Sequence, residues 1–165
     1  MNTFFKFATI ENISFFLGLI GTAGTAWQVI QSRRKIKTNL HYFGYNSENG
    51  LALAYIQFDN LSNSAISVTD VSLLIGNNYY PCQKLPISVS STYRQIGKKE
   101  FSYSDIYNIQ LPVCLSGFGG SSGYFLFQIP KESVLPVSTH RKFLISTSRG
   151  SSFQVELKPV REYLP

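Results

Sequence analysis

The first part of the chain is apolar without interruption, and the rest alternates between apolar and polar positions. No residue between Glu11 and Arg33 carries a charge. As an α-helix this run, Asn12–Ser32, is about 31 Å long, which matches the hydrocarbon core of a bilayer. A helix buried in a protein core normally keeps a charged face, and this run has none. We therefore predict an N-terminal helix that spans a membrane once.

The charges beside this run predict its orientation. A cleaved signal peptide carries positive charge before its apolar stretch, whereas the basic residues here follow it. Basic clusters mark the cytoplasmic side of a span and attract anionic lipid headgroups. We expect a single-pass protein of the cell membrane whose C-terminal domain is cytoplasmic. The juxtamembrane basic cluster consists of Arg33, Arg34, Lys35 and Lys37.

One side of the predicted helix carries small and polar residues, while Phe16, Ile20 and Trp27 point the other way. Small residues let a second helix approach closely in lipid, so this side is expected to join copies of the chain in a homo-oligomer. The alternative is a chance stripe, because Gly and Thr are common in membrane spans. The residues assigned to helix association are Gly18, Gly21, Thr22, Thr25 and Gln28.

After Lys37 the pattern has the period of two that is typical of half-buried strands. It is clearest in Ala54–Phe58 and Phe153–Leu157. In Ile66–Ile75 the phase slips between Val68 and Val71, which predicts a β-bulge. Further strands are expected at 40–45, 78–82, 107–115 (an edge strand or a bulge at Pro112), 124–129 and 142–147, with a long connection over 84–104.

These segments predict a mainly β fold in two parts. Residues 1–37 form the transmembrane anchor and its basic segment, and residues 38–165 form the second domain. Many short strands separated by turn residues, with no helical period, indicate an antiparallel β-sandwich of the immunoglobulin-like kind or a small barrel. The anchor, the basic stop and the run FDNLSNSAISVTDVSLLI together resemble small bacterial and prophage single-span membrane proteins with an immunoglobulin-like sandwich. The resemblance implies a fold and a setting, and it assigns no functional residue.

Composition changes this picture little. The net charge is +6, and the juxtamembrane cluster supplies four of these charges, so we expect membrane contact rather than nucleic-acid binding. The two cysteines, Cys82 and Cys114, form no CxxC motif and are expected to be free thiols in a reducing compartment.

The most conspicuous loop is rich in glycine and precedes a predicted strand. A phosphate-binding loop would need a following helix and a lysine, and neither is present. The loop is either a flexible hairpin connection or a binding loop lined by backbone groups. Its residues are Gly117, Phe118, Gly119, Gly120 and Gly123.

No motif in the sequence indicates catalysis or metal binding. The only histidines, His41 and His140, lack the sequence context of a catalytic triad, and no Cys or His pair has the spacing of a metal site. We expect no catalytic residue, no metal and no cofactor. The sequence favours a membrane-tethered, non-catalytic domain that binds another protein, in a phage, prophage or host-defence setting. The alternative is a ligand-sensing domain whose helix oligomerises in the membrane.

Overall fold

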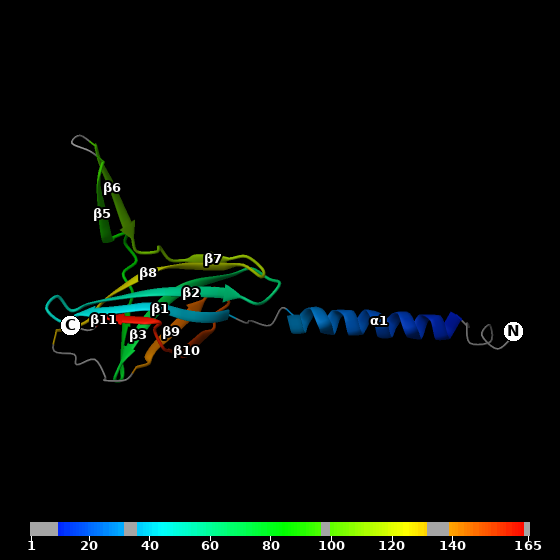
Figure 1. Cartoon of the computed structure of the whole chain (residues 1–165). Helices are drawn as coiled ribbons and strands as arrows, with labels where there is room; N and C mark the ends of the chain where they lie inside the picture. The colour runs from blue at the N-terminus through cyan, green and yellow to red at the C-terminus, as the bar shows by residue number, and fades with distance from the viewer. Residues whose placement is uncertain (1–9, 32–35, 97–99, 132–138, 164–165) are drawn as a thin grey trace. The chain divides into compact units, whose positions relative to one another are not determined.

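The structure is a computed structural model that describes residues 10–31, 36–96, 100–131 and 139–163. The chain divides into two compact units, 1–34 and 35–165. The first contains the helix α1 (Ile10–Gln31), and the second contains the strands (Figure 1). The first strand begins at Ile36, two residues before the boundary expected from the sequence.

The apolar run is helical, as predicted. In α1, large apolar side chains on several sides, including Phe15, Leu17 and Ile20, are more than half exposed. The Thr22 hydroxyl donates a hydrogen bond to the backbone oxygen of Gly18, and the Thr25 hydroxyl donates to that of Gly21. Within the described residues no helix is both long enough and apolar enough to cross a membrane. The membrane span therefore stays a prediction.

Four strands form the first sheet, here called sheet A. They are β1 (Ile36–Asn46), β2 (Leu51–Asn60), β8 (Gly120–Gln128) and β11 (Arg161–Tyr163), in the order β11-β1-β2-β8. Neighbours are antiparallel except β11, which pairs in parallel with β1. Figure 1 shows the red C-terminal strand β11 beside the cyan β1, although the two are far apart in the sequence.

Five strands form the second sheet, sheet B. They are β3 (Ile66–Ile75), β4 (Asn78–Pro81), β7 (Val113–Leu115), β9 (Arg141–Thr147) and β10 (Ser152–Leu157). The order is β10-β9-β3-β4, and β7 also pairs with β3. The predicted bulge in β3 is confirmed, because the pairing of β3 with β9 shifts register between Val68 and Asp70.

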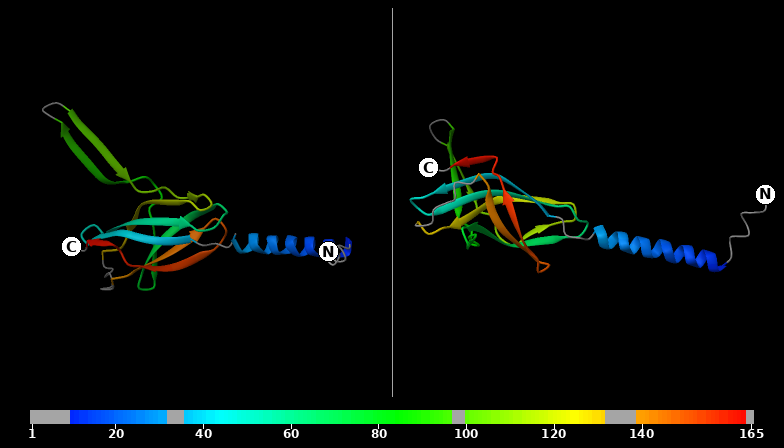
Figure 2. Two further views of the ribbon diagram at one scale, coloured as in Figure 1. Left: turned by 45° about the vertical axis from the view of Figure 1, so that its right-hand side comes forward. Right: turned by 90° about the horizontal axis from the view of Figure 1, so that it is seen from below.

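The strands of the two sheets lie in two layers (Figure 2), and their buried side chains form one apolar core. Each second residue of β2, from Ala52 to Phe58, is buried, which is what the alternation in the sequence predicts. Aromatic rings fill much of the space: Phe58 packs edge-on against Phe125 at 5.8 Å between centroids, and Phe127 lies 6.0 Å from Phe143. Each such side chain contributes about 1.5–3 kcal/mol when fully buried. The mainly β class is therefore confirmed.

A buried ion pair joins the edge strand β11 of sheet A to β9 of sheet B. Arg141 of β9 is only 2% exposed, and its Nε and Nη2 both donate to Oε1 of Glu162 in β11. The guanidinium also lies 5.0 Å from the ring centre of Phe43 in β1. The three-residue strand β11 is thus held by this ion pair as well as by its pairing with β1.

The long connection expected over 84–104 is wrong for most of its length. Strands β5 (Ser88–Ile96) and β6 (Glu100–Tyr107) form a hairpin, here called the arm, and within the described residues they pair only with each other. Buried Asn108 anchors the arm: its amide donates to the backbone oxygens of Gln83 and Leu85, and its Oδ1 accepts from the Ile87 N–H. A hairpin that pairs with no other strand has little need of the alternation that marks a half-buried strand.

The strand expected over 107–115 is also shorter than predicted. Tyr107 ends β6, residues 108–112 form a connection with a cis Leu111–Pro112 bond, and only Val113–Leu115 pair as β7. Ile109 and Leu111 still pack against the core from that connection. Apolar alternation here reflects packing of an irregular segment rather than one continuous strand.

Candidate functional site

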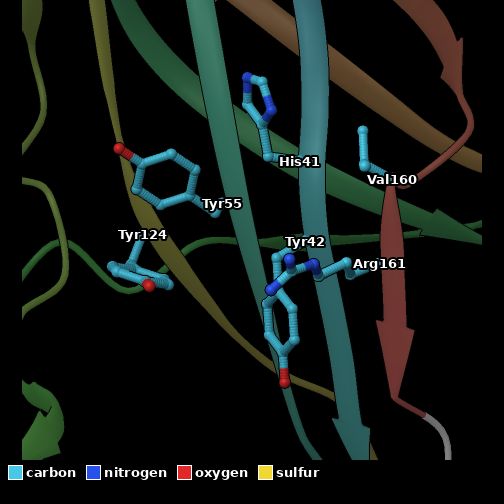
Figure 3. Close-up of a pocket in the computed structure, with 6 residues that line it drawn as sticks. All are labelled: His41, Tyr42, Tyr55, Tyr124, Val160 and Arg161. Atoms are coloured by element: carbon cyan, nitrogen blue, oxygen red, sulfur yellow. The ribbon is translucent and has the colours of Figure 1, made fainter.

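The outer face of sheet A carries an open hollow of about 340 Å³. Pairing register places Tyr42 of β1 beside Tyr55 of β2, and Tyr55 beside Tyr124 of β8. The hollow is lined by His41, Tyr42, Tyr55, Tyr124, Val160 and Arg161 (Figure 3). All four strands of sheet A, and Val160 just before β11, therefore line one surface that is rich in aromatic side chains.

An irregularity in β1 increases the number of side chains at this surface. The pairing of β1 with β2 shifts register between Leu40 and Tyr42, so His41 is an extra residue. Leu40 and Phe43 are buried, whereas the consecutive residues His41 and Tyr42 are both half-buried and line the hollow. A β-bulge re-aims side chains in this way, and such bulges are frequent beside binding sites.

The rings in the hollow are held in edge-to-face contacts. Tyr55 and Tyr124 lie 4.8 Å apart between centroids at an angle of 65°, and His41 lies 6.0 Å from Tyr55 at 62°. The Tyr55 hydroxyl also shares a 2.9 Å hydrogen bond with Ser122. These contacts fix the ring planes, so a ligand would meet a preorganised surface (Figure 3).

A chain of polar side chains orients His41. Gln57 Nε2 donates to Asp59 Oδ1 at 2.9 Å, so Gln57 Oε1 is the atom that faces His41 Nε2, at 2.8 Å. An amide oxygen only accepts, which assigns the proton to Nε2 of His41. Asn39 also donates to Asp59, at 3.4 Å. The chain positions the imidazole as part of the wall of the hollow.

A second hollow of about 180 Å³ lies next to the first and shares Tyr42 with it. Its other lining residues include Gly44, Leu51, Leu53 and Tyr163. Gly44 leaves room for the Tyr42 side chain, because a Cβ atom at that position would meet the Tyr42 hydroxyl at 2.5 Å and displace it. The two hollows together form what we call the sheet A groove, mixed in polarity at one end and mainly apolar at the other.

Arg161 gives the sheet A groove its charge. Alternation along β11 separates Arg161 and Tyr163, which line the groove, from Glu162, which binds Arg141. Among the described residues no carboxylate forms an ion pair with Arg161. The guanidinium side chain extends from β11 toward Tyr42 (Figure 3). An exposed cation beside aromatic rings is suited to an anionic group on a ligand.

The glycine-rich loop is packed and does not join neighbouring strands of one sheet. It carries the chain from β7 of sheet B to β8 of sheet A, and Gly120 and Gly123 already belong to β8. A Cβ at Gly117 would meet the Asn63 backbone oxygen at 2.3 Å. Phe118 has a left-handed backbone (φ 54°) and is 70% exposed. The expected flexible hairpin is therefore wrong, and a binding role for the loop remains a prediction.

Buried Asn60 holds this loop in place. Its amide nitrogen donates to the backbone oxygens of Ser64 and Ser116, both at 2.9 Å, and its Oδ1 accepts from the Ser62 hydroxyl at 2.6 Å. The Phe118 N–H donates to the Ser62 oxygen. The close approach of the Asn63 backbone to Gly117, and of the Ser116 hydroxyl to Gly119, explains why this segment is rich in glycine.

The other residues selected from the sequence lie in separate places. Gly18, Gly21, Thr22 and Thr25 are exposed along α1, and the side chain of Gln28 lies outside the described residues. Arg33, Arg34 and Lys35 also lie outside them, and Lys37 is an exposed residue of β1. His140 precedes β9, Cys82 is buried, Cys114 is exposed, and both thiols are free. No group of three or more His, Cys, Asp or Glu residues in the described part of the chain could hold a metal ion.

Sequence reasoning did not find the sheet A groove. Tyr55 occupies an outward position of the clean alternation in β2, and Tyr124 occupies the outward row of β8. A large aromatic residue at an outward strand position was the available signal. Which of the ten tyrosines in the chain would meet depended on the pairing of strands distant in the sequence.

Comparison with known proteins does not assign the chain to a family. No family model and no curated protein matches the chain. An inactive mutant of a GH20 exo-β-N-acetylglucosaminidase from Vibrio harveyi is 14% identical at a TM-score of 0.30, with 79% of this chain and 18% of that chain covered. A β-glucosidase from Listeria innocua in complex with glucose is 13% identical at 0.30, with 80% and 17% covered.

The Iho670 flagellar-like filament is 10% identical at a TM-score of 0.32, with 92% of this chain and 98% of the filament chain covered. This chain spans less than a fifth of the length of either glycosidase. At TM-scores this low the likenesses support no statement about fold or function.

Proposed function

We propose that this protein is a membrane-tethered, non-catalytic β domain that binds another protein through the sheet A groove. The observation that carries the proposal is the groove itself: a fixed set of aromatic side chains beside an exposed arginine on the outer face of a sheet. Tyrosine and arginine are enriched where proteins bind each other, because both combine apolar area with directed polar groups. Tyr163 and Val160 add apolar surface, at 62% and 76% exposure.

Membrane tethering rests on the charge pattern and on α1. The uncharged run is followed by the juxtamembrane basic cluster, which favours a cytoplasmic C-terminal domain in the cell membrane. Apolar side chains of α1 are exposed on several sides, which water disfavours and lipid accepts. The hydroxyls of Thr22 and Thr25 bond within the helix, so they need no water. An immunoglobulin-like sandwich of the prophage membrane type fits this arrangement and remains part of the proposal.

A binding role is favoured over catalysis by the surroundings of His41. Its hydrogen bond goes to the Gln57 amide rather than to a hydroxyl or thiol that it could activate. A second candidate is a ligand-sensing domain whose helix oligomerises in the membrane. The volume of the larger hollow, about 340 Å³, falls in the range of small-molecule sites and favours that candidate.

Photo-crosslinking from defined positions would test the protein-binding proposal. A photoreactive amino acid at Tyr124, in the groove, should give a discrete crosslinked protein when the full chain is expressed in its native cells. The same amino acid at Glu156, an exposed residue of sheet B, is the matched control and should not. Equal crosslinking from both positions, or none from the groove, would contradict the proposal.

A separate experiment tests the association of anchors. Replacing Gly18 and Gly21 with Leu should preserve insertion but keep a second helix away, because an added Cβ at either position meets nothing within 4 Å beyond the helix's own nearby backbone and would displace only a partner. Replacing Phe16 and Ile20 with Leu is the control. Crosslinking between copies in the membrane should fall for the glycine variant alone. Equal crosslinking in both variants would mean that the small-residue side does not join helices.

A further inference from the structure

We propose that the sheet A groove binds an extended peptide segment that presents an apolar side chain and a carboxylate two residues apart. The inference rests on the proposed function and specifies the chemistry of the partner. Its basis is the arrangement of two hollows on either side of Tyr42, one with Arg161 at its edge and the other lined by leucines.

The length of the groove favours a peptide over a single ring or a single ion. The lining residues on β1 run from His41 to Asn46. At about 3.3 Å per residue this distance is roughly 17 Å, the length of about five residues of extended chain. The apolar end, with Leu51, Leu53 and Tyr163, suits an aliphatic side chain better than a sugar, which would leave its hydroxyl groups without partners there.

The spacing between the two anchor points sets the spacing in the ligand. Arg161 and Tyr163 lie on the same side of β11 two residues apart, which is about 7 Å. In an extended peptide, side chains two positions apart point to the same face at the same spacing, whereas adjacent side chains point to opposite faces. A ligand that places an aliphatic side chain against Tyr163, in the apolar hollow, can therefore reach Arg161 with a carboxylate two residues away.

The charge of Arg161 determines which second side chain of the peptide the groove prefers. Arg161 has no ion-pair partner among the described residues, and the nearby Glu162 is occupied by Arg141. A guanidinium donates two parallel hydrogen bonds to a carboxylate, and a lysine or glutamine side chain on the ligand cannot take the place of that carboxylate. Acidic segments of the partner are thus preferred over neutral or basic ones.

Synthetic heptapeptides with a serine and threonine background would test the inference against the full-length chain. The first carries Leu-Thr-Glu, the second Leu-Thr-Gln, and the third Leu-Glu-Thr; each is measured in both sequence directions by fluorescence anisotropy. The first should bind about tenfold more tightly than the other two, which corresponds to about 1.4 kcal/mol. In the Arg161→Gln variant the Glu and Gln peptides should bind with equal affinity. In the Arg161→Glu variant a Leu-Thr-Lys peptide should bind more tightly than the Leu-Thr-Glu peptide.

Two variants complete the test. Leu53→Asn should weaken binding of all the peptides alike, because it alters the apolar hollow. Lys142→Gln removes an exposed cation of sheet B and should change nothing. Equal binding of the Glu and Gln peptides, or of adjacent and spaced pairs, would overturn the inference. Binding of polygalacturonate, an acidic polysaccharide, without binding of any peptide would also overturn the inference.

The two proposals fail in different ways. If position 124 still crosslinks a protein while no peptide shows the Arg161-dependent preference, protein binding stands and the peptide class is wrong. If position 124 crosslinks no protein, the proposed function fails, whatever the peptides do.

Discussion

Loss of the Glu162 carboxylate should destabilise the second unit by far more than loss of an ordinary surface charge. Arg141 is 2% exposed, and both of its bonds to Glu162 end on one oxygen, Oε1. Removing one partner of a buried pair leaves a desolvated charge and costs about 3–5 kcal/mol. Glu162 is itself 24% exposed, so water reaches the site and lowers the expected cost of Glu162→Ala to about 2–3 kcal/mol.

The adjacent pair in sheet B provides the control. Lys142 and Glu156 lie 3.9 Å apart with side chains about half exposed, at 49% and 52%. Glu156→Ala should cost less than about 0.5 kcal/mol. Urea denaturation followed by fluorescence would give both values, and the midpoint for Glu162→Ala should fall while the slope stays unchanged.

A double variant separates the charge from the packing. Arg141→Met combined with Glu162→Leu removes both charges and keeps apolar volume, so most of the lost stability should return. The interaction of Arg141 with the Phe43 ring would be lost as well, which costs about 0.5–2 kcal/mol. If Glu162→Ala costs no more than Glu156→Ala, the carboxylate does not hold Arg141 and β11 must be kept in place by other contacts.

Three further variants test other parts of the core. Tyr45→Phe should raise the free energy of unfolding by about 1 kcal/mol, because the buried Tyr45 hydroxyl has no hydrogen-bond partner among the described residues; a loss of stability would reveal one. Burial raises the pKa of the Cys82 thiol to about 11, so the folded state keeps it neutral while the unfolded state ionises it near pH 9. The wild type should therefore lose about 2 kcal/mol relative to Cys82→Ala as pH rises from 9 to 11, and parallel curves would contradict this. Gly117→Ala should cost about 1–3 kcal/mol because its methyl group would collide with the Asn63 oxygen, whereas thermal melts that match wild type would show that the loop yields.

Strands were predictable from the sequence where one face enters the core. In β2, β3 and β10 the burial pattern follows the alternation of the residues, and in β3 even the bulge at Thr69–Asp70 leaves a phase slip. The arm left no such signal, and none of its described side chains belongs to the core cluster. The three exposed residues of β11 gave none either, since their place depends on a long-range ion pair.

The candidate site was harder to predict for a related reason. Tyr42, Tyr55 and Tyr124 become neighbours only through the register of β1, β2 and β8. The bulge at His41 could not be predicted from the local sequence either, because the consecutive residues His41 and Tyr42 do not break the alternation in a recognisable way. The glycine-rich loop was conspicuous in the sequence for the opposite reason: close packing of backbone against Asn63 requires glycine whether or not anything binds there.

The anchoring of the arm by Asn108 makes that hairpin a removable module. Ser88 and Tyr107 are paired partners at its base, so the chain leaves and re-enters the rest of the fold at nearly one point. Asn108 braces this junction from outside the arm, by bonds to Gln83, Leu85 and Ile87. A domain built in this way can gain, lose or exchange such an insertion while the sheets and their core stay intact. The arm can therefore diversify in evolution independently of the groove.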